Sequence, residues 1–312
     1  MRDLRLPALL LCLCLLLCGC GEAEPGEGGM PARQSAAADG PPLVPYEAPA
    51  LALSEFHADL AEGSDDAKID LSAVSEGYVA VSATSGNRLK FQVLKDEWTY
   101  NYDIASDGTP SIFPLQCGDG DYSFRVMENV GENRYAPLYS TSCTVTLADE
   151  FQPFLRPSDY SHYTGSSACV QKAAQLAGSC SDKMDVVAAV YDFVCKNIRY
   201  DKDKAASVSS GYLPDPDETL ETGKGICFDY ASLAAAMLRS QGIPTKLIFG
   251  YVAPDDLYHA WNMFYTEESG WVTVSFEVSG EGWTRMDLTF SAGGASDEFV
   301  GDGSHYADLY SY

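Results

Sequence analysis

An amphipathic helix is predicted directly after a tight glycine turn in the stretch GICFDYASLAAAMLRSQGIP, residues 225–244. Apolar residues such as Leu233 and Met237 repeat at helical spacing, and Gly242 ends the helix. Cys227 therefore lies in or just before the first helical turn. At that place the unpaired main-chain amides and the positive end of the helix dipole favour the thiolate over the thiol.

A nucleophilic thiolate needs an imidazole partner, and two later segments supply an imidazole and a carboxylate. In YHAWNMFYTE, alternating side chains predict a strand with His259 near its start. In GWTRMDLTF, Asp287 lies in a second extended run, where a carboxylate would hold the imidazole in the tautomer that faces the sulfur. Cys227, His259 and Asp287 thus supply the thiol, the imidazole and the carboxylate that cysteine-based acyl transfer requires.

These segments resemble the transglutaminase-like superfamily in the pieces GICFDYA, LRSQGIPTKLIFGYV, HAW and MDLTF, which together cover roughly residues 185–292. The resemblance implies an α+β fold with a papain-like, transglutaminase-like core, in which the helix that carries the cysteine packs on an antiparallel sheet. It also implies that Cys227 is the nucleophile, His259 the general base and acid, and Asp287 the orienting carboxylate. The family usually has proline after the aspartate, where this chain has Leu288.

Three further residues near the predicted site need an interpretation, and two of them have alternatives. Trp261 either shields the site from water or is an ordinary core residue of the strand. Tyr212, in GYLPDPDETL, is either a second oxyanion donor beside the main-chain amide of Cys227 or part of a surface loop that leads into a helix. Asp229, in the first helical turn, stabilises the helix dipole but disfavours a nearby thiolate, so we interpret it as structural.

Residues 1–20 have the layout of a secretory signal peptide, since a basic start precedes an apolar run too short to span a bilayer. The tetrad Leu17-Cys18-Gly19-Cys20 resembles the lipobox of bacterial lipoproteins, in which the last cysteine is lipidated and becomes the mature N-terminus. We therefore expect a protein that is lipid-anchored through Cys20 on the extracytoplasmic face of the cell membrane. Cleavage without lipidation is the alternative.

The rest of the chain divides by composition and periodicity. Residues 21–45 are rich in Gly, Ala, Pro and Glu and predict a flexible linker. Residues 46–150 contain short alternating runs between Tyr78 and Leu147, separated by turn-forming residues, which predict a small all-β, sandwich-like domain. Residues 151–312 begin with helical periodicity and hold the transglutaminase-like segments, so we expect the catalytic domain there.

Six of the ten cysteines lie outside the leader. Cys169 and Cys180 flank a helical stretch, and eleven residues of continuous helix at about 1.5 Å each would hold them beyond disulfide reach. We expect that pair to be free unless the helix breaks. Cys117 and Cys143 either form a bridge in the β-domain or stay free, and Cys195 is expected to be buried.

The net charge of −25 argues against nucleic acid and anionic lipid head groups as partners. The four histidines are scattered, and neither a phosphate loop nor a calcium loop is present, so we expect no cofactor and no metal. The partners expected are a protein or peptide substrate and the membrane, through the N-terminal lipid.

The sequence thus predicts an extracytoplasmic, membrane-anchored cysteine enzyme that acts on peptide or side-chain amide bonds through a thioester. Peptidase or amidase activity and protein-glutamine acyl transfer share that thioester, and the resemblance does not separate them. The alternative is a non-catalytic surface binding or adhesion lipoprotein that retains the same fold.

Overall fold

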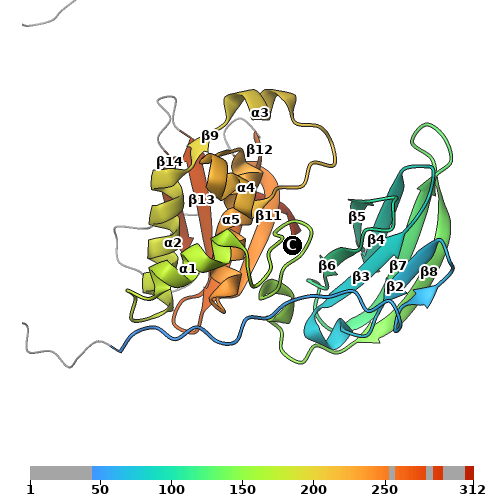
Figure 1. Cartoon of the computed structure of the whole chain (residues 1–312), viewed down its shortest axis with the longest axis horizontal. Coiled ribbons are helices and arrows are strands. Elements are labelled where there is room, and N and C mark those ends of the chain that lie inside the picture. Colours follow the sequence, from blue (N-terminus) through green and yellow to red (C-terminus); the bar gives the residue numbers. More distant parts are fainter. Residues whose placement is uncertain (1–43, 253–256, 279–283, 291–305) are drawn as a thin grey trace, which may run out of the picture. The chain divides into compact units, whose positions relative to one another are not determined.

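The computed structural model describes residues 44–252, 257–278, 284–290 and 306–312. These residues belong to one compact unit. Antiparallel sheets come first along the chain, and a mixed arrangement of helices and sheet follows (Figure 1). The predicted α+β class is therefore confirmed.

The first half is built from two four-stranded antiparallel sheets. The strand order of one is β1 (Glu62–Gly63), β2 (Ala67–Asp70), β3 (Tyr78–Ala83) and β6 (Ser111–Pro114). The order of the other is β5 (Trp98–Ile104), β4 (Leu89–Lys95), β7 (Gly120–Asn129) and β8 (Tyr135–Val145). The apolar runs of the sequence correspond to β4, β5, β7 and β8, whereas β1 and β2 begin before the predicted start of the pattern.

Alternate side chains of β4 and β7 are buried, as expected for strands with one face in a core. The Phe91 ring of β4 stacks on Phe113 of β6 with 5.3 Å between ring centres and on Phe124 of β7 at 6.1 Å. Phe113 belongs to one sheet and the other two residues to the second sheet. The apolar faces of the two sheets therefore meet in a shared core.

The second half contains a five-stranded antiparallel sheet and a set of helices. The strand order is β14 (Thr284–Phe290), β13 (Gly270–Val278), β12 (Leu257–Thr266), β11 (Thr245–Val252) and β15 (Tyr306–Ser311). The helices are α1 (Ala168–Ala177), α2 (Lys183–Asn197), α3 (Lys202–Ser207), α4 (Pro216–Thr222) and α5 (Cys227–Ser240). A short parallel pair joins β9 (Arg199–Tyr200) to β10 (Lys224–Gly225). Two 3-10 turns span Val74–Glu76 and Gln152–Phe154.

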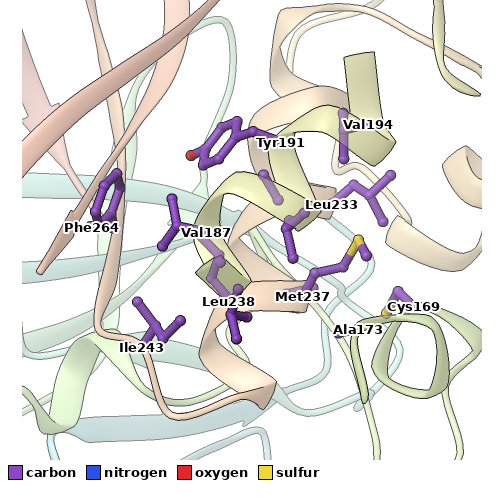
Figure 2. Close-up of a cluster of buried hydrophobic side chains, with 14 of the residues drawn as sticks. Cys169, Ala173, Val187, Tyr191, Val194, Leu233, Met237, Leu238, Ile243 and Phe264 are labelled. Carbon is purple, nitrogen blue, oxygen red and sulfur yellow. The ribbon is translucent and has the colours of Figure 1, made fainter. Parts of the chain in front are cut away.

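Helix α5 is buried from Asp229 to Ser240 without an exposed face. Such a helix belongs in the interior of a fold, and α5 lies beside α1 and α2, which cover one side of the sheet (Figure 1). Its Leu233 and Met237 belong to a cluster that draws on all three helices and on β12 (Figure 2). The other labelled members are Cys169, Ala173, Val187, Tyr191, Val194, Leu238, Ile243 and Phe264. The predicted arrangement, a cysteine-bearing helix on an antiparallel sheet, is confirmed.

A second cluster joins the two halves. It contains sandwich residues such as Tyr100 and Tyr102 together with Ala231 of α5, Ala260 of β12 and Tyr312. The Tyr312 ring lies 5.5 Å from Tyr100 and 5.7 Å from Tyr102, centre to centre. The sandwich thus shares apolar contacts with the strands that carry the predicted site.

The six cysteines within the described ranges are free. Cys169 lies in α1 and Cys180 beyond its end, and the expectation that this pair is not bridged is confirmed. Cys117 and Cys143, for which a bridge was left open, are also free, and Cys195 is only partly buried.

Among the helices in the described part of the chain, none has both the length and the apolar composition that crossing a membrane requires.

Candidate active site

Cys227 is the first residue of α5, directly after the N-cap residue Ile226, whose backbone is extended. The turn before it is fixed by β10, where Lys224 and Gly225 pair with Arg199 and Tyr200 of β9. A Cβ on Gly225 would come within 2.5 Å of the Asp229 Cβ, so only glycine fits this close approach. The glycine turn therefore places the thiol at the helix start.

Main-chain amides surround the sulfur of Cys227, but burial dominates its ionisation. Burial raises the pKa of the Cys227 thiol, and hydrogen bonds from the main-chain N–H groups of Ala260, Phe228 and Cys227 itself offset part of that effect. The negative charge of Asp229 raises the pKa further. The main-chain amides at the helix start do stabilise the thiolate, as predicted, but they do not outweigh the effect of burial.

His259 lies in β12 opposite Gly250 of β11 and is partly buried. It lines the same cavity as Cys227, a space of about 540 Å³. The cavity is lined by Tyr200, Ala205, Val208, Ser209, Gly211, Tyr212, Ile226, Cys227, Phe228, Phe249, Tyr258 and His259. The structure thus brings the predicted thiol and imidazole to one site.

Trp261 follows His259 by two residues in β12, and its ring lies 6.4 Å from the imidazole, centre to centre, at an interplanar angle of 22°. The side chain is fully buried. It is therefore a core residue, and it also forms the buried neighbour of the His259 ring. The interpretation of Trp261 as a core residue is confirmed, and a role in shielding the site from water stays a prediction.

Asp287 lies in β14 opposite Ser275 of β13, and β13 in turn pairs with β12. Neighbouring strands are about 4.8 Å apart, so the backbone of Asp287 is roughly 10 Å from the strand that carries His259. The side chain of Asp287 lies outside the described residues. Its assignment as the orienting carboxylate remains a prediction.

The structure distinguishes the two interpretations of Tyr212. Its hydroxyl donates to the Oδ1 of Asp229 at 2.5 Å and accepts from the Nζ of Lys204 at 2.6 Å. A hydroxyl has one proton to donate, and here the buried carboxylate takes it. Tyr212 is therefore no oxyanion donor in this arrangement. The alternative for its segment is confirmed, because a helix, α4, does start there with Asp215 as N-cap.

Two features of the site were missed by sequence reasoning. One is Lys204 of α3, which forms an ion pair with the fully buried Asp229 at 2.9 Å. Nothing in the spacing of a single lysine in a charged loop indicates such a partner. The other is the amide of Ala260, whose N–H points at the sulfur from β12. The sequence places Ala260 directly after His259, but the direction of its N–H depends on how the strands pair, which the sequence pattern does not show.

A second, smaller cavity of about 180 Å³ adjoins the first. The two share the lining residues Gly211, Tyr212, Phe228, Phe249 and Tyr258. Asn101 and Asp103 of β5 line the second cavity, so the sandwich contributes directly to it. The two cavities therefore form one surface that starts at the thiol. Its far part is lined by polar residues of the sandwich and by several aromatic rings.

Metal binding has no support in the described ranges, where no three His, Cys, Asp or Glu side chains gather in a way that could hold an ion.

Comparison with known proteins agrees with this geometry. Residues 170–276 match the transglutaminase-like superfamily. The match includes Cys227 and His259 and ends before β14, so Asp287 lies outside it.

Individual relatives are distant or cover little of the chain. A UPF0252 protein of Methanocaldococcus jannaschii is 37% identical over 67 residues, which are 20% of this chain and 19% of that protein. The human kyphoscoliosis peptidase is 26% identical over 161 residues, 48% of this chain and 24% of the peptidase. The chain thus spans less than a quarter of the length of these curated relatives. A candidate cysteine protease of Cytophaga hutchinsonii, known from its crystal structure, aligns over 81% of this chain and 89% of its own at 16% identity and a TM-score of 0.38.

Proposed function

We propose that the protein is a cysteine enzyme acting on peptide or side-chain amide bonds through a thioester. The premise is that residues 170–276 match the transglutaminase-like superfamily. The observation that carries the proposal is that Cys227 and His259 line one cavity, with the thiol at a helix start. A nucleophile and a general base that face a common space are the minimum that acyl transfer requires.

The proposed reaction begins with proton transfer from the Cys227 thiol to the His259 imidazole. Because burial raises the pKa of Cys227, the thiol needs this partner at neutral pH. The sulfur then attacks the amide carbonyl, and His259 returns the proton to the leaving amine as the C–N bond breaks. Water or a second amine next attacks the thioester and loses a proton to His259, the C–S bond breaks, and the proton on His259 returns to the sulfur.

The carbonyl oxygen gains negative charge during each attack and needs hydrogen-bond donors. We assign that role to the main-chain amides that surround the sulfur, those of Cys227 and Ala260. Fixed backbone donors suit the role because they require no reorganisation when the charge develops. This assignment replaces the one made for Tyr212.

A polypeptide is the substrate class we favour. The two adjoining cavities form a surface that runs from the thiol to the edge strand β5, longer than one side chain needs. Cysteine enzymes that hold an extended chain gain binding energy from residues flanking the reacting amide, and aromatic walls such as Phe228 and Phe249 supply apolar contact.

Alkylation kinetics test the catalytic assignment. Iodoacetamide near neutral pH is expected to modify Cys227 faster than the other thiols, and His259→Ala is expected to slow that reaction. The His162→Ala variant serves as the control, because His162 does not line the cavity. Equal and slow alkylation of all cysteines would instead support the non-catalytic alternative, a surface binding lipoprotein. That alternative has one observation in its favour, Leu288 directly after Asp287, where the family usually has proline.

Hydrolysis and transfer are separated by products. The mature protein is incubated with a library of glutamine-containing peptides, with and without a primary amine. Incorporation of the amine supports transfer, and peptide fragments support proteolysis. The Cys227→Ala variant must abolish either product if the thiol is the nucleophile.

We also propose that the mature protein is anchored in the membrane through a lipid on Cys20 and works on the extracytoplasmic face. The signal-peptide layout and the lipobox-like tetrad support this placement. Several acyl chains on one cysteine give lasting attachment, since each buried methylene contributes about 0.8 kcal/mol. Mass spectrometry of the membrane fraction should find the acyl chains, and Cys20→Ala should release the protein. Unchanged retention of that variant would argue against the anchor.

A further inference from the structure

A buried carboxylate beside the cavity is held by donors from three parts of the chain. Asp229, in the first turn of α5, accepts from the main-chain N–H of Ile226 at 2.7 Å and from the Tyr212 hydroxyl at 2.5 Å. The Nζ of Lys204 in α3 lies 2.9 Å from its Oδ2. The same Nζ lies 2.6 Å from the Tyr212 oxygen and 4.4 Å from the centre of that ring.

This network joins the segment 201–213 to the helix that carries the nucleophile. Gly211 and Tyr212, at the end of the segment, line both cavities. Asp229 is completely buried, whereas the Lys204 side chain keeps about a quarter of its surface exposed, 28%. A buried charge needs a partner, so the ion pair sets where this wall of the site can lie.

The network also affects the charge near the sulfur. The titratable groups that face Cys227 or line its cavity are Asp229 from its own helix, Tyr200 from β9, Tyr212 from the segment before α4, and Tyr258 and His259 from β12. Asp229 is the carboxylate among them, and its charge raises the pKa of the thiol. The Lys204 ammonium, in direct contact with that carboxylate, opposes the effect.

We propose that Lys204 is a positioning residue of this site, which with Tyr212 holds the segment 201–213 against the start of α5 and offsets the Asp229 charge beside the Cys227 sulfur. The role of the sulfur as nucleophile rests on the proposed function, but the electrostatic effect on the sulfur does not.

The test is the pH dependence of Cys227 alkylation by iodoacetamide in the full mature chain. Lys204→Met leaves the Asp229 carboxylate without its opposing charge and should move the pH profile to higher pH by about one unit. Below the midpoint of the profile, this shift makes alkylation about tenfold slower. Asp229→Asn removes the charge, keeps an acceptor for the Ile226 N–H, and should move the profile to lower pH. The double variant should return close to the wild-type profile, and Lys204→Arg should preserve it.

Lys202→Met is the matched control, because Lys202 is exposed in the same helix and should leave the profile unchanged. If Lys204→Met does not fold, the double variant should restore folding, since it no longer buries an unpaired charge. Shifts of the two single variants in the same direction, or no shift in either, would overturn the proposal. Opposite shifts without turnover of any amide substrate would sustain this proposal and count against the proposed function.

Discussion

At the scale of single residues, the site depends on Gly225, a residue without a side chain. Gly225 ends β10, and a methyl group there would come 2.5 Å from the Asp229 Cβ. The neighbour is a buried side chain fixed by three donors, so it cannot move aside without disturbing the network around it. The requirement for glycine comes from this close approach, and the sequence shows it only as a turn signal.

Gly225→Ala should therefore destabilise the fold by overpacking, by about 1–3 kcal/mol in the free energy of unfolding. Urea denaturation followed by circular dichroism measures this loss. Gly86→Ala is the matched control, because a Cβ at Gly86 would meet nothing within 4 Å. Equal stabilities of the two variants would show that the Asp229 side chain yields at no cost.

Single residues also show which parts of the site could be predicted from the sequence. Cys227 and His259 could be predicted because each lies in a segment with a strong period and a recognisable resemblance. For Tyr212 the sequence left two interpretations open, and the oxyanion role does not fit, since its proton is taken by a carboxylate that folding brings from another element. Lys204 could not be predicted for the same reason, because a buried ion pair has no signature until both residues have a place.

At the scale of elements, the N-terminus of one helix is capped by a side chain from another helix. The N-cap residue of α1, Ser167, makes no side-chain cap. Instead, Asp217 of α4 accepts from the main-chain N–H groups of Cys169 at 2.8 Å and Ala168 at 3.0 Å. These N–H groups lack partners within their own helix, and a carboxylate also suits the positive end of the helix. The contact therefore fixes α4, and with it the segment before α5, on α1.

Asp217→Ala should cost about 1 kcal/mol at neutral pH, the usual value of a cap. Burial acts to raise the pKa of Asp217, but hydrogen bonds from Cys169 and Ala168 outweigh it and the pKa is lowered. A carboxyl whose pKa is lower in the folded state stabilises above its unfolded value and loses this effect as pH falls through the folded value. The stability difference between wild type and variant should thus shrink in acid.

Thermal or urea unfolding between pH 7 and pH 2 checks this pattern. Glu221→Ala, an exposed change in the same helix, controls for helix composition and should differ little from wild type at any of these pH values. A stability difference for Asp217→Ala that persists undiminished in acid would assign the loss to packing and not to the carboxylate.

The elements themselves were predicted with uneven success, for physical reasons. Helix α5 was expected to be amphipathic, but it is buried on all sides because α1 and α2 cover the face away from the sheet. The helical period of its apolar residues does not show which other helices pack on it. Asp287 does lie in a strand, as expected, yet β13 separates this strand from the one that carries His259. Sequence patterns predict strands, whereas their order in a sheet depends on long-range pairing.

At the scale of the whole molecule, the two halves were predicted as separate domains. Separate domains ordinarily have their own cores and unfold independently unless the interface is large and apolar. Here one apolar cluster contains residues of the sandwich and of the α+β half, and Tyr312 joins them through ring contacts with Tyr102 at 5.7 Å and Tyr160 at 4.6 Å. The sandwich also supplies Asn101 and Asp103 to the second cavity, which adjoins the cavity that Cys227 lines. Substrate contact and stability should therefore depend on both halves together.

The free thiols provide a probe in each half, Cys117 in the sandwich and Cys169 in α1. Pulsed alkylation at increasing urea concentrations, read by mass spectrometry, should expose both at the same midpoint, because unfolding of either half would open the shared cluster to water. Tyr102→Leu removes the ring contacts that link the halves and should separate the two midpoints. If Cys117 is exposed well before Cys169 in the wild-type chain, the shared cluster contributes little, and the sandwich is a dispensable neighbour of the site instead of part of it.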